Sequence, residues 1–344
     1  MSLTLTGAPT FGQILPQDIK AATGELTEEQ RASLAEFVDP LMEGLVAGNP
    51  ADISTARTII LREFNSPAAT PEFKEAFSNQ IGKHMSQAMG AEDELVRINA
   101  MIITTRLTTD LAQELIDQGL SDSNAAVQYW GAKAYRDRVL RMVDEQGRSR
   151  LPNDEQQKII QRVKELIETD PVVAVVQSSF EILIALSVPE AQRELLDQLN
   201  NRVTKHAQQP QMSYRAEQEA LRQLTNKFIR ERRVEKRDQQ ALMSASFRYF
   251  MLTTRQMNRG VVLPENQAGH KAMMDTSHQA LAAIGAREQG VELPEGFAEV
   301  KDLIRLNSWE KLTQVGQRWQ PVLQAPPFEL IAQQLLIPPP PASE

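Results

Sequence analysis

Apolar residues recur along most of this chain at intervals of three and four. Leu95, Ile98 and Ile102 follow this spacing, and Leu221 and Leu224 begin a second example. Residues spaced in this way share one face of an α-helix, so the pattern predicts amphipathic helices that each bury one face. No run alternates strictly between apolar and polar residues, as a half-buried strand does. We therefore expect an all-α protein without a sheet.

Glycine and proline mark where the predicted helices end. No proline occurs between Pro71 and Pro152, and no glycine occurs between Gly147 and Gly260. Because both residues are poor helix formers, these long stretches without them favour helix. Counting between the breaks predicts roughly fifteen helices.

Several polar residues are placed to begin helices. Three pairs have the spacing of a capping box, in which two side chains three residues apart cap each other's backbone amides. They are Thr27 with Gln30, Ser187 with Glu190, and Asn307 with Glu310. Asp170 precedes Pro171, which fits an N-cap followed by a proline in the first helical turn.

A pattern of an acid, a β-branched residue and a small residue recurs in the first 200 residues. The clearest copies are Asp93, Val96-Arg97 and Ala100; Asp122, Val127 and Gly131-Ala132; and Asp170, Val175-Val176 and Ser179, with a fainter copy at Asp52, Ala56-Arg57 and Ile60. The acid caps the helix, and the β-branched residue faces a partner helix. The small residue lets the next helix approach closely, because the distance between helix axes depends on side-chain size at the contact.

This pattern resembles the HEAT/armadillo class of α-helical repeats, whose inner helices carry an Asp-Pro-x-Val-Arg-x-x-Ala-like core. The resemblance covers roughly Asp52 to Arg202, and the arginine of the core is kept at Arg57 and Arg97. Residues 56, 96, 127 and 175 stand 40, 31 and 48 apart, whereas a regular array repeats at about 40–47 residues. The resemblance implies an α-α superhelix, built as an irregular stack of antiparallel helix pairs.

Four parts of the chain are expected from these breaks. They are an extended or short-helix lead-in (1–25), a HEAT-like helical stack (26–208), a C-terminal helical region that continues or caps the stack (209–337), and a proline-rich tail (338–344). Four consecutive prolines favour polyproline II and cannot join a helix, so we expect a frayed tail.

Composition narrows the possible chemistry. The 344 residues carry a formal net charge of −8, which on average repels nucleic acid. The chain has no cysteine, so it has no disulfide, cysteine-ligated zinc or thiol nucleophile.

The start lacks the basic and apolar segments of a signal peptide, which leaves open a cytoplasmic protein or one exported with its signal already removed. The most apolar segment, 172–188, is about 25 Å long as a helix and is too short to span a membrane, so we expect it to form a buried helix.

No catalytic, cofactor-binding or metal-binding residue is assigned. His270 and His278, the closest pair of the four histidines, stand eight apart, whereas zinc-binding helices place histidines three to five apart. We interpret them as surface histidines of an amphipathic helix. The glycine-rich nucleotide-binding motifs and the nucleophile motif of hydrolases are also missing from the sequence.

One basic segment stands out from the acidic total. Its candidate partner-binding residues are Arg230, Arg232, Arg233, Lys236 and Arg237. On a single helix these residues spread over several faces, and Glu231 and Glu235 intervene, so pairing within the helix is available. The segment is either a docking patch for an acidic partner or a solvated helix. It lacks interleaved aromatic residues for stacking on bases, which disfavours nucleic acid as a partner.

Three aromatic residues and two arginines lie on one predicted helix. Tyr129, Trp130 and Tyr135 precede Arg136 and Arg138, and such residues are typical of interface hot spots. Because Trp130 adjoins the small residues of the repeat pattern, we expect it to be buried between helices instead.

Three functions remain from the sequence. The first is a non-enzymatic protein-binding or scaffold protein, because a helical stack presents a large surface. The second is a ligand-binding protein or enzyme on the same frame, with a pocket that sequence does not reveal. The third is nucleic-acid binding, which depends on the basic segment alone.

Overall fold

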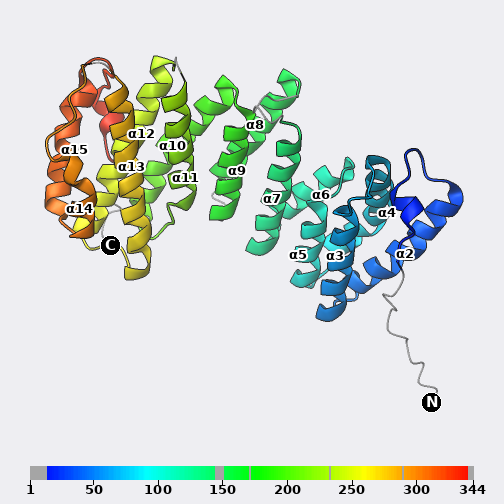
Figure 1. The fold of residues 1–344 in the computed structure, drawn as a ribbon. Helices are drawn as coiled ribbons and strands as arrows, with labels where there is room; N and C mark the ends of the chain where they lie inside the picture. Colours follow the sequence, from blue (N-terminus) through cyan, green and yellow to red (C-terminus); the bar gives the residue numbers. More distant parts are fainter. Residues whose placement is uncertain (1–13, 144–150, 170–171, 232–233, 289, 340–344) are drawn as a thin grey trace. The chain divides into compact units, whose positions relative to one another are not determined.

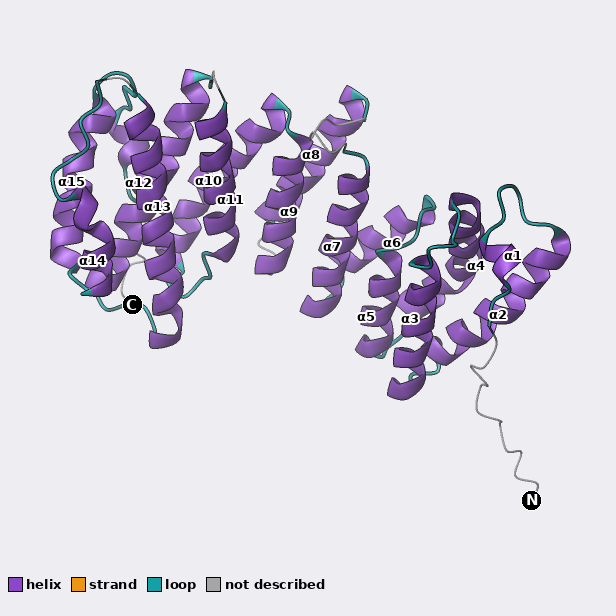
Figure 2. Cartoon of the chain, viewed as in Figure 1, coloured by secondary structure: helices purple, strands orange, loops and turns teal. Residues whose placement is uncertain are grey.

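A computed structural model describes residues 14–143, 151–169, 172–231, 234–288 and 290–339. In these residues the regular structure consists of fifteen α-helices and three short 3-10 helices, with no strand (Figure 2). The expected all-α fold is confirmed. The predicted N-cap at Asp170, the proline that follows it, and residues 340–344 of the expected frayed tail lie outside the described residues.

The chain forms two compact units, Met1–Arg141 and Met142–Glu344. The break expected near residue 208 falls inside the second unit. The first unit contains α1 (Gln17–Lys20), α2 (Glu28–Val46), α3 (Pro50–Phe64), α4 (Pro71–Met89), α5 (Glu94–Thr104), α6 (Leu111–Leu120) and α7 (Ala125–Arg141). The second contains α8 (Asn153–Glu168), α9 (Val173–Leu186), α10 (Pro189–Gln208), α11 (Arg215–Arg230), α12 (Lys236–Asn258), η1 (Pro264–Asn266), α13 (Gln267–Arg287), η2 (Phe297–Glu299), α14 (Val300–Arg305), α15 (Trp309–Gln324) and η3 (Ala332–Leu335).

In the first unit, α2 packs on α3 and α4, and α5 packs on α3 and α7. Three aromatic rings at one end of this core touch in series: Phe73 stacks on Phe77 at 5.2 Å between centroids, and Phe64 meets Phe77 at 4.8 Å. One small residue of the recurring pattern, Gly131, acts as expected. A Cβ added at Gly131 would lie 2.9 Å from backbone atoms of α6, so α7 approaches α6 closely there.

In the second unit the helices form two rows (Figure 1). One row contains α8, α10 and α12, and the other contains α9, α11 and α13, with each helix packing on the next member of its own row. The apolar segment at 172–188 forms α9, and Val175, Val176 and Phe180 are buried, as the sequence predicts. Among the described helices, none is both long and apolar enough to cross a bilayer.

One of the three predicted capping boxes is present. The Thr27 hydroxyl accepts from the Gln30 amide at the start of α2, and the Gln30 side chain accepts from the Thr27 amide. The other two predictions are wrong. Ser187 closes α9 in a left-handed conformation (φ 50°), because Pro189 begins α10 two residues later. Asn307 is also left-handed (φ 54°), and α15 begins after Ser308 without a side-chain cap.

Candidate functional site

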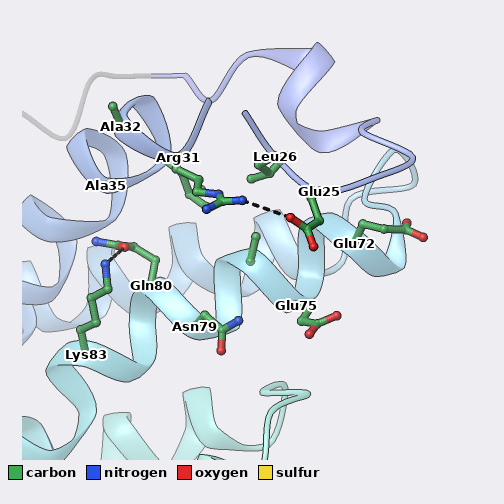
Figure 3. A pocket seen from close by; sticks show the side chains of 12 residues that line it. Glu25, Leu26, Arg31, Ala32, Ala35, Glu72, Glu75, Asn79, Gln80 and Lys83 are labelled. Atoms are coloured by element: carbon green, nitrogen blue, oxygen red, sulfur yellow. Dashed lines mark hydrogen bonds and ion pairs between the residues drawn. The ribbon is translucent and has the colours of Figure 1, made fainter. Parts of the chain in front are cut away.

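A groove of about 680 Å³ lies between α2 and α4 in the first unit, beside the loop that precedes α2 (Figure 3). We call it the α2–α4 groove. It is lined by Glu25, Leu26, Arg31, Ala32, Leu34, Ala35, Glu72, Glu75, Ala76, Asn79, Gln80 and Lys83. Most of its polar lining residues are exposed, whereas Leu26 and Leu34 are buried and form an apolar floor.

The loop beside the groove is held in place by the start of α4. The Thr70 hydroxyl caps α4 by accepting from the Phe73 amide, and it donates to the Ala22 carbonyl oxygen at 2.5 Å. The Thr70 amide also donates to the Lys20 carbonyl at 3.1 Å. Thr70 therefore joins the start of α4 to the loop that precedes α2.

The charges of the α2–α4 groove are arranged along its length. Figure 3 shows Glu25, Glu72 and Glu75 at one end and Lys83 at the other. Arg31 reaches Glu25 at 3.5 Å, but both side chains are exposed and such a pair stabilises little. Within the described chain, Glu72 and Glu75 have no cation at ion-pairing distance. This end therefore carries uncompensated negative charge.

The lysine end of the groove is held by a short polar chain. Lys83 Nζ donates to Gln80 Oε1 at 2.6 Å, and Gln80 Nε2 donates to Asp39 Oδ1 at 2.6 Å. His84 Nε2 lies 3.0 Å from the same Asp39 oxygen. Asp39 on α2 thus positions two residues of α4, and through Gln80 it fixes the position of the Lys83 ammonium.

A second cluster of ionisable side chains lies inside the second unit. Arg202 Nε donates to Glu217 Oε1, and His206 Nε2 lies 3.0 Å from the same oxygen. The His206 ring stacks on Tyr214 at 3.9 Å between centroids. Tyr249 meets the His206 ring edge-on. The cluster joins α10, α11 and α12.

The electrostatics of this buried cluster keep Glu217 ionised. Burial by itself would raise the pKa of Glu217, but the His206 and Arg202 groups outweigh it and lower that pKa to about 2. Burial raises the pKa of Tyr214 and of Tyr249 well above 10, and the Glu217 charge raises both further. Arg202, His206 and Glu217 are at most 3% exposed, so this cluster holds helices together and does not face solvent.

The interpretation of His270 and His278 as surface residues is wrong, because both are buried. His270 contacts the Asn266 carbonyl through Nδ1 and Gln256 Oε1 through Nε2. His278 lies between the rings of Phe250 and Phe297, and burial lowers its pKa to about 4. Among the described residues, no group of three or more His, Asp or Glu side chains is placed to hold a metal ion.

The basic segment does not form one helix. The helix α11 ends at Arg230 and α12 begins at Lys236. Arg230 and Arg237 are exposed, and Lys236 pairs with Glu329 near the C-terminus. Arg232 and Arg233 lie outside the described residues. The structure therefore separates the candidate residues onto two helix ends, where the expectation of one helix was wrong.

The aromatic residues of α7 are only partly buried. Tyr135 is buried, whereas Trp130 is half-buried and Tyr129 is 40% exposed. Lys133 Nζ lies 4.5 Å from the centre of the Trp130 ring, a cation–π contact at the surface. Burial of Trp130 between helices was thus overestimated, because its flank faces solvent.

Sequence reasoning missed both the α2–α4 groove and the Arg202–Glu217–His206 cluster. One signal was available for each. Ala32 and Ala35 place small residues one turn apart on α2, and Arg202 and His206 place two cationic residues one turn apart on α10. In comparisons with protein families, curated proteins and solved structures, no match to the chain was found.

Proposed function

We propose that this protein binds another protein and serves as a non-enzymatic scaffold, and that the α2–α4 groove receives a short basic amphipathic helix of the partner. The observation that carries the proposal is the groove itself, with an apolar floor, small residues along its walls and unpaired carboxylates at one end. The assignment to the HEAT/armadillo class stays a prediction that is compatible with this role.

The groove dimensions support a helix as the occupant. Glu72 and Lys83 lie eleven residues apart on α4, which corresponds to about 16 Å at 1.5 Å per residue, or three helical turns. Ala32, Ala35 and Ala76 line this length. Small residues at a contact allow two helix axes to approach closely, so a third helix can lie against α2 and α4.

The charges define the face that the partner presents. Glu72 and Glu75 are exposed and unpaired in the described chain, so a lysine or arginine of the partner finds free carboxylates there. Lys83 at the opposite end favours an acidic residue. Apolar side chains between these two ends would lie against Ala32, Ala35 and Ala76, above the buried Leu26 and Leu34. A helix with basic residues near one end, apolar residues in the middle and an acidic residue near the other end therefore fits the groove.

The exposure of the polar residues favours a protein over a small molecule. Small-molecule sites are concave and enclose most of their ligand, with few polar groups placed precisely inside. In the α2–α4 groove most polar side chains stand exposed at the rim, and the buried lining residues are Leu26, Leu34 and Gln80. This arrangement, an apolar centre with a polar rim, is the anatomy of a protein interface.

The experiment uses a display library of helix-biased peptides selected on the full chain. The proposal expects enriched peptides with basic residues near one end and apolar residues at helical spacing. Their binding, measured by fluorescence anisotropy, should fall by about tenfold or more in the double variant Glu72→Lys/Glu75→Lys, a loss of about 1.4 kcal/mol.

The matched control is the double variant Glu28→Lys/Glu29→Lys. It makes the same charge change on α2, at residues that do not line the groove. If both double variants weaken binding equally, the attraction is a general effect of net charge and the groove is not the site. Selection of no peptide, or of acidic peptides only, contradicts the proposal outright.

A further inference from the structure

The C-terminal segment, residues 328–338, lies along α12 and is held through its backbone. Gln240 Nε2 donates to the Phe328 carbonyl at 2.6 Å, and Ser244 Oγ donates to the Gln334 carbonyl at 2.7 Å. Further along α12, Arg248 Nε donates to the Leu336 carbonyl at 3.0 Å, and Arg255 donates to the Pro338 carbonyl at 3.2 Å. Four side chains of one helix therefore bind four carbonyl oxygens in sequence order.

The segment is held by three buried side chains as well as by the hydrogen bonds to its backbone. Phe328, Leu330 and Leu335 are buried and anchor it. Among the described residues after Leu330, Leu335 alone is buried, and Ile331 and Leu336 are 61% and 64% exposed. Hydrogen bonds to backbone carbonyls carry no information about residue type, so the same row of donors can hold the backbone of another chain.

Two guanidinium groups of this row have no carboxylate partner in the described chain. Arg248 donates to Asn200 O and Asn200 Oδ1 in addition to the Leu336 carbonyl, and Arg255 contacts the Pro338 carbonyl. Burial lowers the pKa of both arginines, and Arg259 adds like charge beside Arg255. A partly desolvated guanidinium is bound better by a carboxylate than by a neutral carbonyl.

Asn200 of α10 prepares this surface. Its Nδ2 donates to the Ala241 carbonyl at 3.1 Å, and its Oδ1 lies 3.1 Å from the Ser244 hydroxyl, whose single proton it shares with the closer Gln334 carbonyl. Because Arg248 donates to Asn200 as well, the guanidinium is held by α10 whatever lies along α12. The middle of the donor row, Ser244 and Arg248, is therefore in contact with α10 as well as with the C-terminal segment.

We propose that the α10–α12 face binds an acidic, extended segment of a partner protein, and that residues 331–338 of the chain occupy this face until the partner displaces them. In the chain's own segment, Ser244 holds a carbonyl of the 3-10 helix η3, whereas Arg248 and Arg255 hold the Leu336 and Pro338 carbonyls in the non-helical backbone that follows it. The arginine end of the row is therefore the part that fits an extended backbone. The unpaired Arg248 and Arg255 define the missing component as negative charge. This surface belongs to the second unit and is independent of the α2–α4 groove.

The experiment compares two labelled peptides binding to the full chain at low ionic strength. The first peptide has the sequence of residues 328–339, and the second carries glutamate at the positions of Gln333, Leu336 and Pro339, which are exposed in the structure. We expect the acidic peptide to bind about tenfold more tightly, the equivalent of about 1.4 kcal/mol. Hydrogen exchange of the chain's own amides at 331–337 should become faster as the peptide binds.

Variants locate the binding site. Arg248→Gln and Arg255→Gln should each remove most of the preference for the acidic peptide, whereas Arg237→Gln, an exposed arginine of the same helix, should leave it unchanged. Arg255→Gln keeps the test valid if Arg248→Gln disturbs the contact with Asn200, and the helical circular dichroism of each variant reports on folding. Equal binding of the two peptides, binding without release of 331–337, or an equal effect of Arg237→Gln would each overturn the proposal.

Discussion

Replacing Glu217 by glutamine tests the buried cluster directly. The folded pKa of Glu217 is about 2 against 4.5 for an ordinary glutamate, and 2.5 units correspond to about 3 kcal/mol of stability at neutral pH. Glutamine also leaves Arg202 and His206 without their buried anion. Removing one partner of a buried pair costs about 3–5 kcal/mol, so we expect a loss of that size in the free energy of unfolding at pH 7.

The pH dependence gives the sharper result. The folded pKa of Glu217 lies below the unfolded one. The contribution of Glu217 to the free energy of unfolding is therefore complete above about pH 4.5 and is lost as the pH falls towards 2. About 2 kcal/mol of it is gone by pH 3. The difference in unfolding free energy between the natural chain and Glu217→Gln should therefore shrink by about that amount between pH 7 and pH 3.

Urea unfolding followed by tryptophan fluorescence measures this difference. In a Trp130→Phe background, the two remaining tryptophans, Trp309 and Trp319, report on the second unit, which contains Glu217. Glu219→Gln is the control on the same helix, where a more exposed carboxylate pairs with Arg222 and contributes less than about 1 kcal/mol. A loss for Glu217→Gln that stays constant from pH 7 to pH 3, or equals that of Glu219→Gln, refutes the reasoning.

Two further predictions concern packing in each unit. The folded pKa of His278, about 4, lies below the ordinary 6.5. The contribution of His278 to the free energy of unfolding is therefore complete above about pH 6.5, and about 2 kcal/mol of that free energy should be lost between pH 7 and pH 5. His278→Phe should remove that loss, and an NMR titration placing the pKa near 6.5 would contradict it. Gly131→Ala should destabilise the first unit by about 1–3 kcal/mol in thermal unfolding, because its Cβ would lie 2.9 Å from the Gly119 and Leu120 backbone. Gly24→Ala, with open space around it, should change little; equal effects of the two substitutions would argue against close packing.

The helical fold followed from the sequence because its signals are local. The apolar run at 172–188 indicated a buried helix, and breaks at proline and glycine indicated helix ends. Local signals predicted the wrong helix start where two of them pointed to different residues. Ser187 has the residue type and spacing of an N-cap, but Pro189 forces the next helix to begin later, and the serine closes the previous one.

The candidate sites depend on residues far apart in the sequence, which a single chain does not reveal. Arg202 and His206 share a face of α10, but their partner Glu217 lies beyond a turn on α11. His270 and His278 appeared polar enough for the surface, yet α12 and η2 cover them. The basic segment seemed continuous only because the break between Arg230 and Lys236 contains neither glycine nor proline.

Hydrogen exchange of the full chain with and without a selected basic helical peptide tests the protein-binding role most directly. The measurement follows every backbone amide of the described helices under the same conditions. Our account predicts slower exchange confined to the first turns of α2 and to α4 between Glu72 and Lys83. Unchanged exchange in those helices while the peptide is bound, or protection centred on another surface, would contradict it.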